Sequence, residues 1–207
     1  MTESGFEVTR VDDLARIPVA HGLEWRPIAR RFGIRAFGMN AYTSAQPGDW
    51  VVEEHTEQSG HEEVYVVLAG RATFTVGGEE LDAPAGTIVF VRDPTLERVA
   101  RSEEEGTTVL AVGGWPDKAF EPSSWEWFFE AYQQEPEQGI ATLEDGIRRL
   151  GERPELLYHL ACMEAKAGRD EDAAKHLVRA VELRPELRED AERDDDLKQI
   201  VSDLPAA

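Results

Sequence analysis

The sequence predicts an α+β chain in which a mainly-β first part is followed by an all-α second part. Up to about residue 115, short runs rich in β-branched and aromatic residues alternate with turns that contain Gly and Pro. Beyond that point apolar residues recur with the period of helices, and Gly and Pro mark the helix ends. We therefore expect a β-barrel over residues 1–116, a connector over 117–123 and a helical domain over 124–207.

Five segments have the composition of half-buried strands, namely residues 33–43, 64–68, 71–76, 87–91 and 107–112. Gly77 and Gly78 follow the third segment, and two consecutive residues that tolerate positive φ are typical of a tight β-hairpin turn. Pro47-Gly48 and the stretch 84–86 mark further turns. Many short strands with no helix between them predict a barrel or a sandwich of two sheets.

In the helical part, residues 154–187 carry apolar residues where two helices can pack closely. These are Leu157, Leu160 and Ala161 on the first predicted helix, and Ala173, Leu177 and Ala180 on the second, before Pro185. The pattern resembles one tetratricopeptide repeat, a helical hairpin of about 34 residues. Residues 125–153 resemble a weaker copy, and Leu197, Ile200, Val201 and Leu204 predict a last short helix. One repeat forms no groove by itself, so the helices either stabilise the barrel or offer a docking surface to a protein partner.

The composition of the chain is acidic. Its 207 residues include 42 Asp and Glu against 22 Lys and Arg, which gives a formal net charge of −20. Nucleic acids and anionic membranes require a cationic surface, so we expect neither as a partner. The sequence has no apolar run of about 18 residues and no signal peptide, and its single cysteine, Cys162, is expected to be a buried thiol. These features predict a cytoplasmic protein without an internal disulfide.

Residues 48–112 contain several motif residues in a characteristic order. A His-rich turn is followed by Glu63, by Gly70, by the predicted hairpin, and then by a turn that ends at Gly86 and an apolar strand. In this order the segment resembles the cupin superfamily, whose first motif contains Glu63 and Gly70 and whose second motif opens at Gly86. The resemblance implies a β-barrel of the double-stranded β-helix or jelly-roll type that holds one divalent metal ion.

The cupin resemblance also implies a set of metal ligands, and the sequence departs from that set twice. The family uses two histidines in an H-x-H pair, one Glu or Gln, and a histidine of the second motif. Here His55 and His61 lie six residues apart, and alignment from Gly86 without gaps puts Glu97 at the second-motif position. A metal interpretation assigns His55, His61, Glu63 and Glu97 to a site for iron, manganese, nickel, zinc or copper.

A second interpretation is that the metal site has been lost. His61 and Glu63, which share strand parity, then line a polar pocket, and Glu97 pairs with an arginine or lies in solvent. Tyr65 and Phe74 are predicted to line the same pocket and to contact an organic ligand. The other glutamates of this region, Glu53, Glu54, Glu57 and Glu62, are expected to form a solvated acidic rim.

Two functions follow from these interpretations. The first is a small-ligand-binding or regulatory protein, whose helices serve assembly or contact with a protein partner. The alternative is a metal-dependent enzyme of the dioxygenase or isomerase type that acts on a small organic substrate, because the cupin fold hosts such enzymes. The sequence does not decide whether the chain is an enzyme. In both cases we expect a homodimer, because cupin barrels pair through strand edges and exposed edges associate unless they are covered.

Overall fold

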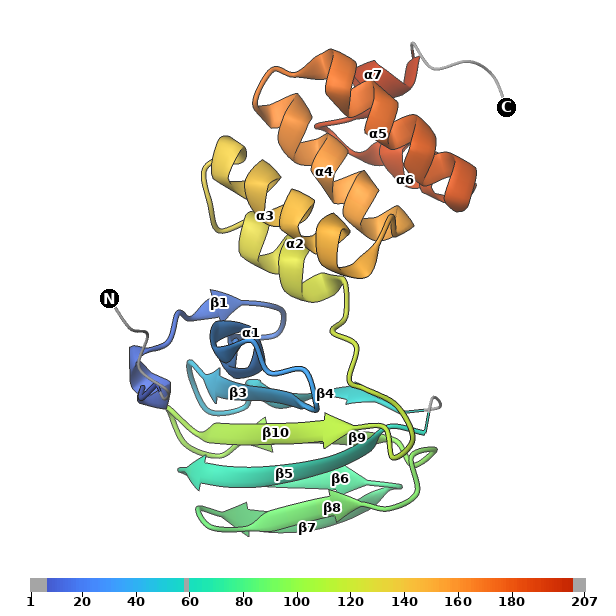
Figure 1. The fold of residues 1–207 in the computed structure, drawn as a ribbon. Coiled ribbons are helices and arrows are strands. Elements are labelled where there is room, and N and C mark those ends of the chain that lie inside the picture. The colour runs from blue at the N-terminus through green and yellow to red at the C-terminus, as the bar shows by residue number, and fades with distance from the viewer. Residues whose placement is uncertain (1–6, 58–59, 203–207) are drawn as a thin grey trace. The chain divides into compact units, whose positions relative to one another are not determined.

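The computed structural model describes residues 7–57 and 60–202 of the chain. It divides into two compact units, Met1–Glu121 and Pro122–Ala207. The first unit contains the strands and the second contains only helices, so the α+β class is confirmed (Figure 1). No helix within the described residues is both long enough and apolar enough to cross a membrane.

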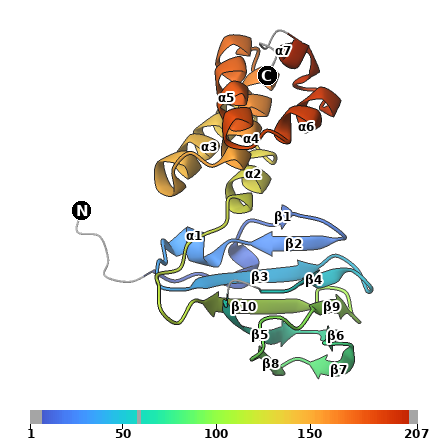
Figure 2. The ribbon, with the colours of Figure 1, turned by 90° about the vertical axis from the view of Figure 1, so that its right-hand side faces the viewer.

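The N-terminal unit is a sandwich of two antiparallel sheets. The larger sheet has the order β1 (Ile17–Pro18), β2 (Leu23–Arg26), β3 (Gly38–Ser44), β10 (Thr108–Gly114), β5 (Glu62–Ala69) and β8 (Ile88–Val91). The smaller sheet has the order β4 (Trp50–His55), β9 (Arg98–Ser102), β6 (Arg71–Val76) and β7 (Glu79–Pro84). The two sheets face each other in Figures 1 and 2. No strand pairing among the described residues joins them, so the mainly-β prediction is confirmed as a sandwich and closure into a barrel is not shown.

The space between the sheets is filled by side chains from both. The larger sheet contributes Tyr65, Val67, Val89, Val91 and Val109, and the smaller sheet contributes Val51, Val52, Ala72, Phe74, Ala83 and Ala100. Along β5, β6 and β8 these positions alternate, as they must where one face of a sheet is buried, whereas Val51 and Val52 are adjacent on β4, where the register with β9 shifts. The alternation fixes which residues of β5 point inward, and it therefore positions the candidate site.

Two glycine turns fix the strand connections around β6. Gly77 and Gly78 both have positive φ, 57° and 86°, and they form the two-residue turn between β6 and β7 as predicted. Gly70, between β5 and β6, has a φ of 71°. A Cβ at Gly70 would also lie 2.8 Å from the Cα of Thr107, so this position excludes larger residues for two separate reasons.

The N-terminal segment differs from the strand predicted over residues 33–43. Residues Ile28–Phe32 form the short helix α1, and Gly33 ends it in the left-handed conformation, so β3 begins only at Gly38. The segment before α1 contains a 3₁₀ turn, η1 (Val11–Asp13). Leu14 and Ile28 pack with Ala41 of β3 and cover the outer side of that strand.

The C-terminal unit consists of consecutive helices. They are α2 (Trp125–Ala131), α3 (Pro136–Leu150), α4 (Pro154–Lys166), α5 (Asp170–Leu183), α6 (Leu187–Arg193) and α7 (Lys198–Ser202). Neighbouring helices contact one another along the series α2–α3–α4–α5, and α6 contacts α7. The hairpin predicted over 154–187 therefore corresponds to α4 and α5, while its assignment to the tetratricopeptide family stays a prediction.

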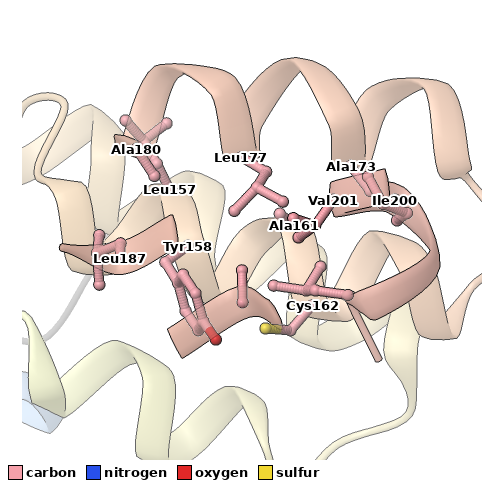
Figure 3. Packing of buried hydrophobic residues seen from close by; sticks show 12 residues of the cluster. Leu157, Tyr158, Ala161, Cys162, Ala173, Leu177, Ala180, Leu187, Ile200 and Val201 are labelled. Atoms are coloured by element: carbon pink, nitrogen blue, oxygen red, sulfur yellow. The ribbon is translucent and has the colours of Figure 1, made fainter. Parts of the chain in front are cut away.

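Small and large apolar residues fill the core between α4, α5, α6 and α7 (Figure 3). Figure 3 shows Leu157 and Ala161 of α4 beside Leu177 of α5, and all of these side chains are buried. Ile200 and Val201 of α7 close the same cluster, whereas Leu204 lies outside the described residues. The apolar positions that define the predicted hairpin are therefore its core.

Polar groups are also buried in the helical unit. Glu164 is fully buried and its Oε2 lies 2.7 Å from Nδ1 of His176. Cys162 is buried, as predicted, and its thiol donates to Asp194 at 3.7 Å. Burial, together with the charge of Asp194, raises the pKa of the Cys162 thiol to about 12. A thiol with such a pKa is protonated at neutral pH and serves packing.

Candidate functional site

The candidate site lies between the two sheets, where β4, β5 and β9 bring polar side chains together. His55 is the last residue of β4 and Arg98 is the first residue of β9, and the two are cross-strand partners. Glu63 lies on β5 in the opposite sheet and shares the inward face with Tyr65. Residues from both sheets therefore converge on the carboxylate of Glu63.

Oxygen Oε2 of Glu63 is the centre of a hydrogen-bond network. It accepts hydrogen bonds from the Tyr65 hydroxyl at 2.5 Å and from Nη2 of Arg98 at 2.8 Å. It also lies 3.2 Å from Nε2 of His55. Charge-assisted hydrogen bonds are the strong ones in proteins, so this carboxylate is held firmly by three donors.

Arg98 is a buried cation whose guanidinium is fully used inside the protein. Its side chain is 1% exposed, against 14% for that of Glu63. Nη1 of Arg98 donates to the carbonyl oxygens of Pro94 and Leu96 at 3.0 and 3.1 Å. Arg98 and Glu63 thus form a buried ion pair, and the carbonyl bonds hold the guanidinium in place without any ligand.

The surroundings shift the pKa values of the network in opposite directions. Burial favours the neutral form of Glu63, but hydrogen bonds from His55, Tyr65 and Arg98 outweigh it and lower the pKa to about 2. Burial also disfavours the His55 imidazolium, yet the hydrogen bonds to Glu63 and to the carbonyl of Glu53 raise its pKa. Burial and the charge of Glu63 raise the pKa of Tyr65. The network therefore holds a carboxylate between cations and a neutral phenol.

His61 is buried beside this network, yet its ring has no hydrogen-bond partner. Neither Nδ1 nor Nε2 is satisfied by any residue that the structure describes. Nδ1 lies 3.7 Å from Oε1 of Glu63, which is too far for a hydrogen bond. Buried polar atoms are normally paired, so two unpaired ring nitrogens require an explanation.

Aromatic residues of the segment after β10 cover His61. The ring centroid of Trp115 lies 4.8 Å from that of His61, and Phe120 follows at 6.1 Å. Gly113 makes room for the imidazole, because a Cβ there would come within 2.5 Å of Cε1 of His61. Lys118 places its ammonium 4.2 Å from the Trp115 ring centroid. His61 therefore lies between a charged network and an aromatic cover.

The structure brings together some of the residues predicted as metal ligands and separates others. Ligand atoms of His55, Glu57 and Glu63 all lie within 4.8 Å of one another. Glu57 was expected in a solvated rim and instead joins this group. Glu97 is exposed, and it stands one residue before Arg98, which points inward in its place. Metal binding by any of these residues stays a prediction.

The donor types at His55, Glu57 and Glu63 suit a divalent transition metal, but the charge balance does not. A guanidinium already lies 2.8 Å from Glu63 and neutralises it. A metal cation would have to compete with Arg98 and with the proton of Tyr65 for the same carboxylate. Arg98 thus already supplies the positive charge that a metal ion would supply to Glu63. The residues present therefore do not fit a resident metal ion.

The predicted pocket residues Tyr65 and Phe74 are core residues. Both are buried, and their ring centroids lie 5.8 Å apart between the two sheets. Only the hydroxyl of Tyr65 reaches the polar network. Their contact with a ligand stays a prediction, and the residues nearest to the unpaired His61 ring are Trp115 and Phe120.

Sequence reasoning missed Arg98, Trp115 and Phe120 as site residues. A signal for Arg98 exists, because the small residues Ala100 and Ser102 alternate with Val99 and Arg101 on β9. That alternation places Arg98 on the inward face with Ala100 and Ser102, and the burial pattern of β9 agrees. No comparable pattern marks Trp115 and Phe120, which lie outside any strand.

Residues 41–113 match the protein family described as Cupin domain. The matched stretch runs from β3 to β10 and covers about a third of the chain. It contains both sheets' contributions to the site, from His55 to Arg98, as well as Gly70 and Gly86 of the two motifs. No curated protein gives a significant match to the chain.

The solved structures that match part of the chain include several cupins. A cupin from Shewanella frigidimarina is 15% identical over 56% of this chain and 95% of its own, with a TM-score of 0.42. A predicted oxalate decarboxylase from Thermotoga maritima is 19% identical over 52% of this chain and 97% of its own, with a TM-score of 0.44. The cupin domain of a transcriptional regulator from Enterobacter cloacae is 18% identical over 46% and 98%, with a TM-score of 0.39. Likeness at this level identifies no shared ligand or reaction.

Proposed function

We propose that the cupin domain binds a small polar organic molecule at His61 and Glu63 without the help of a resident metal. The single observation that carries this proposal is the buried ring of His61, whose two nitrogens lack partners among the described residues. Leaving a buried donor or acceptor unpaired costs about 1–3 kcal/mol. A ligand that supplies the missing hydrogen bonds recovers this free energy on binding.

The chemistry of the surroundings defines the class of ligand. Oxygen Oε1 of Glu63 accepts no hydrogen bond from the described residues, while Oε2 is held by Arg98, Tyr65 and His55. A hydroxyl group can donate its hydrogen to Oε1 of Glu63 and accept a hydrogen bond from a ring N–H of His61. The charges of Glu63 and Arg98 offset each other, so the ligand need not carry a charge of its own.

The aromatic cover favours a ligand with an apolar face. Trp115 and Phe120 pack over His61 with ring centroids 5.9 Å from each other. Aromatic rings bury large apolar areas, and binding sites combine such surfaces with a few polar groups. Sugars and hydroxylated small acids carry both kinds of surface, and we propose these classes as ligands.

Thermal-shift measurements on the full chain test this proposal. Neutral monosaccharides, sugar acids and small carboxylic acids are added singly in the presence of a chelator, and hits are measured by calorimetry. We expect a ligand whose affinity falls at least tenfold in both His61→Ala and Glu63→Gln, because each removes one partner of the ligand. The matched control is Glu97→Gln, an exposed neighbour, which should bind as the wild type does. A ligand that binds all three variants equally would contradict the proposal.

A second candidate function is that of a metal-dependent cupin enzyme, and one observation favours it. His55, Glu57 and Glu63 offer an imidazole and two carboxylates within 4.8 Å. Elemental analysis of protein purified without a metal-affinity tag distinguishes the two functions. A stoichiometric transition metal that is lost in His55→Ala would favour the enzyme. A folded protein free of metal would favour the binding module.

The helical unit completes the proposed function as an assembly or partner-docking element. The support is its series of consecutive helices that contact one another, which resembles repeat proteins that bind other proteins. The cytoplasmic location also stays a prediction.

A further inference from the structure

A second polar side chain without a partner lies on the inner face of the larger sheet. Oδ1 of Asn40 is buried and accepts no hydrogen bond from the residues that the structure describes. Asn40 lies on β3, where its neighbours Met39 and Ala41 pack on the outer side of the sheet. Side chains alternate along a strand, so Asn40 points toward the space between the two sheets. It therefore faces the same space as Glu63 and Tyr65 of β5.

The strand register places Asn40 close to the proposed ligand-binding residues. Asn40 is the register partner of Ala111 on β10, and Ala111 is in turn the partner of Tyr65 on β5. Two residues further along β10, Gly113 is the partner of Glu63. Neighbouring strands lie about 4.8 Å apart, so β3 and β5 are roughly 10 Å apart on either side of β10. Between Asn40 and Glu63, β10 thus contributes one methyl group and one glycine to the inner face.

The inner face of the sheet is open to solvent at this part of β10. Ala111 packs against the core cluster between the sheets, yet it is only partly buried, as are Gly113 and Asn40. The preceding inward residue of β10, Val109, is by contrast completely buried. The ring of His61 extends over Gly113, since a Cβ at Gly113 would lie 2.5 Å from Cε1 of that ring. His61 and Asn40 therefore approach the same space, one from the side of β5 and the other from β3.

We propose that Asn40 is a further ligand-binding residue, and that it makes the site selective for neutral polyhydroxylated molecules over carboxylates. This inference rests on the proposed binding at His61 and Glu63 and narrows the class of ligand. A ligand bound there extends from Glu63 across Ala111 to Asn40.

The hydrogen-bonding character of the unpaired atoms determines this selectivity. Oδ1 of Asn40, Oε1 of Glu63 and one nitrogen of a neutral His61 ring are acceptors, whereas the N–H of that ring is a donor. Each hydroxyl group of a sugar or cyclic polyol can donate a hydrogen bond, so one such molecule can satisfy several of these acceptors. A carboxylate accepts hydrogen bonds and donates none, so it can match only the ring N–H of His61.

The cations beside Glu63 are already engaged within the protein. Nη2 of Arg98 donates to Glu63, and Nη1 donates to two backbone carbonyl oxygens. Nε2 of His55 lies 3.2 Å from the same carboxylate. A ligand carboxylate would therefore face the unpaired oxygens of Glu63 and Asn40, and the net charge of −20 would repel it further.

Calorimetry on the full chain, in the presence of a chelator, tests the selectivity with matched probes. Glucose and galactose are compared with glucuronate and galacturonate, which carry a carboxylate in place of the exocyclic hydroxymethyl group, and myo-inositol is included as a cyclic polyol. We expect a neutral probe to bind, and a sugar that binds to do so at least tenfold more tightly than its acid. Asn40→Ala should weaken this binding at least tenfold, whereas Asn40→Asp keeps an acceptor oxygen and should retain it within about threefold.

Two further variants separate the loss of this contact from a loss of folding. Met39→Leu changes the neighbouring residue on the outer side of the sheet and should bind the neutral probe as the wild type does. Ala111→Val adds methyl groups to the space between Asn40 and Glu63, so it should weaken binding at least tenfold although every polar group remains. Circular dichroism and thermal unfolding verify that each variant is folded.

The outcomes distinguish this inference from the proposed function on which it rests. A neutral probe whose affinity falls in His61→Ala and Glu63→Gln but not in Asn40→Ala would overturn the role of Asn40 and leave the proposed function standing. Tighter binding of the acids than of the neutral sugars would overturn the selectivity in the same way. A wild type that binds none of these probes would overturn the inference as well, and the proposed function would then depend on the small carboxylic acids of its own screen.

Discussion

Replacing Arg98 by Met removes the buried cation of the site while keeping its apolar bulk. The side chain of Arg98 is 1% exposed and donates to Glu63 at 2.8 Å. Without it, the Glu63 carboxylate keeps only Tyr65 and His55 as partners and remains buried. Breaking a buried ion pair by removing one partner typically costs about 3–5 kcal/mol, because the other charge is left uncompensated.

The pKa of Glu63 gives an independent measure of the same effect. It falls from 4.5 to about 2 on folding, which at about 1.4 kcal/mol per pKa unit corresponds to roughly 3 kcal/mol. Arg98 shares this stabilisation with His55 and Tyr65, and it also loses its bonds to two carbonyl oxygens in the variant. We therefore expect Arg98→Met to lower the free energy of unfolding of the N-terminal unit by about 2–4 kcal/mol at pH 7.

The pH dependence has a definite sign. A carboxyl whose pKa is lower in the folded state stabilises the protein above its unfolded pKa, and this contribution is lost as the pH falls toward the folded pKa. In Arg98→Met the pKa of Glu63 should rise. The difference in stability between wild type and variant should therefore be largest near neutral pH and should shrink as the pH falls from 4.5 toward 2.

Urea unfolding, monitored by the hydrogen exchange of backbone amides in β5 and β9, measures this difference in the free energy of unfolding within the N-terminal unit. Arg101→Met is the matched control, because Arg101 lies on the same strand but is exposed, and its loss should change the stability by less than about 0.5 kcal/mol. The double variant with Glu63→Gln should recover part of the loss, since no charge is then left unpaired. If Arg98→Met lowers the free energy of unfolding no more than Arg101→Met does, the ion pair is not buried and the reasoning about the site fails.

Three further predictions concern other parts of the chain. Burial raises the pKa of the Cys162 thiol to about 12, so this thiol should resist alkylation at pH 8 in the native protein and react once urea unfolds the protein. Rapid alkylation of the native protein would contradict the burial of Cys162. His176 has a raised pKa because Glu164 accepts its hydrogen bond, so its stabilisation is full below pH 6.5 and is lost as the pH rises through the folded value. Melting temperatures of wild type and His176→Gln should therefore converge at high pH, and parallel curves would refute this. Gly113→Ala should destabilise the protein by about 1–3 kcal/mol in thermal unfolding, because its Cβ meets the His61 ring at 2.5 Å, whereas Gly114→Ala should be nearly neutral; equal effects would sink the steric argument.

Much of the fold could be predicted from local patterns in the sequence. The strand β6 matches its predicted range of 71–76, and Gly77 and Gly78 form the turn that follows. These predictions succeed because a hairpin depends on neighbouring residues and on backbone conformations that glycine alone adopts easily. The same holds for the α4–α5 hairpin, whose helical period directly specifies which residues meet.

Other elements of the fold could not be read in this way. The strands β1, β2, β4 and β9 have weaker strand composition and were not predicted. β4 and β9, for example, pair with each other although they lie far apart in the sequence. Strand propensity is sensitive to such tertiary context, so local composition underestimates them.

The candidate site shows the same division. The sequence identified Glu63, His55 and His61 from their order and spacing, and the structure places all three near one another. It also put Glu97 at the second-motif position, where the structure instead directs Arg98 inward. A strand has a side-chain period of two, so an error of one residue in register exchanges the inward and outward faces completely.

The sequence by itself determined three things about this chain: that a β-rich part precedes a helical part, where the turns of the β-rich part lie, and that a carboxylate lies at the centre of the site. Each of these depends on residues close together along the chain. Only the tertiary structure decided that Arg98 neutralises Glu63 and that Trp115 covers His61. It also left Ile88 and Phe90 exposed at the edge of the sheet. These contacts join residues from different strands and loops, and their geometry exists only once the two sheets have packed and fixed the register of every strand.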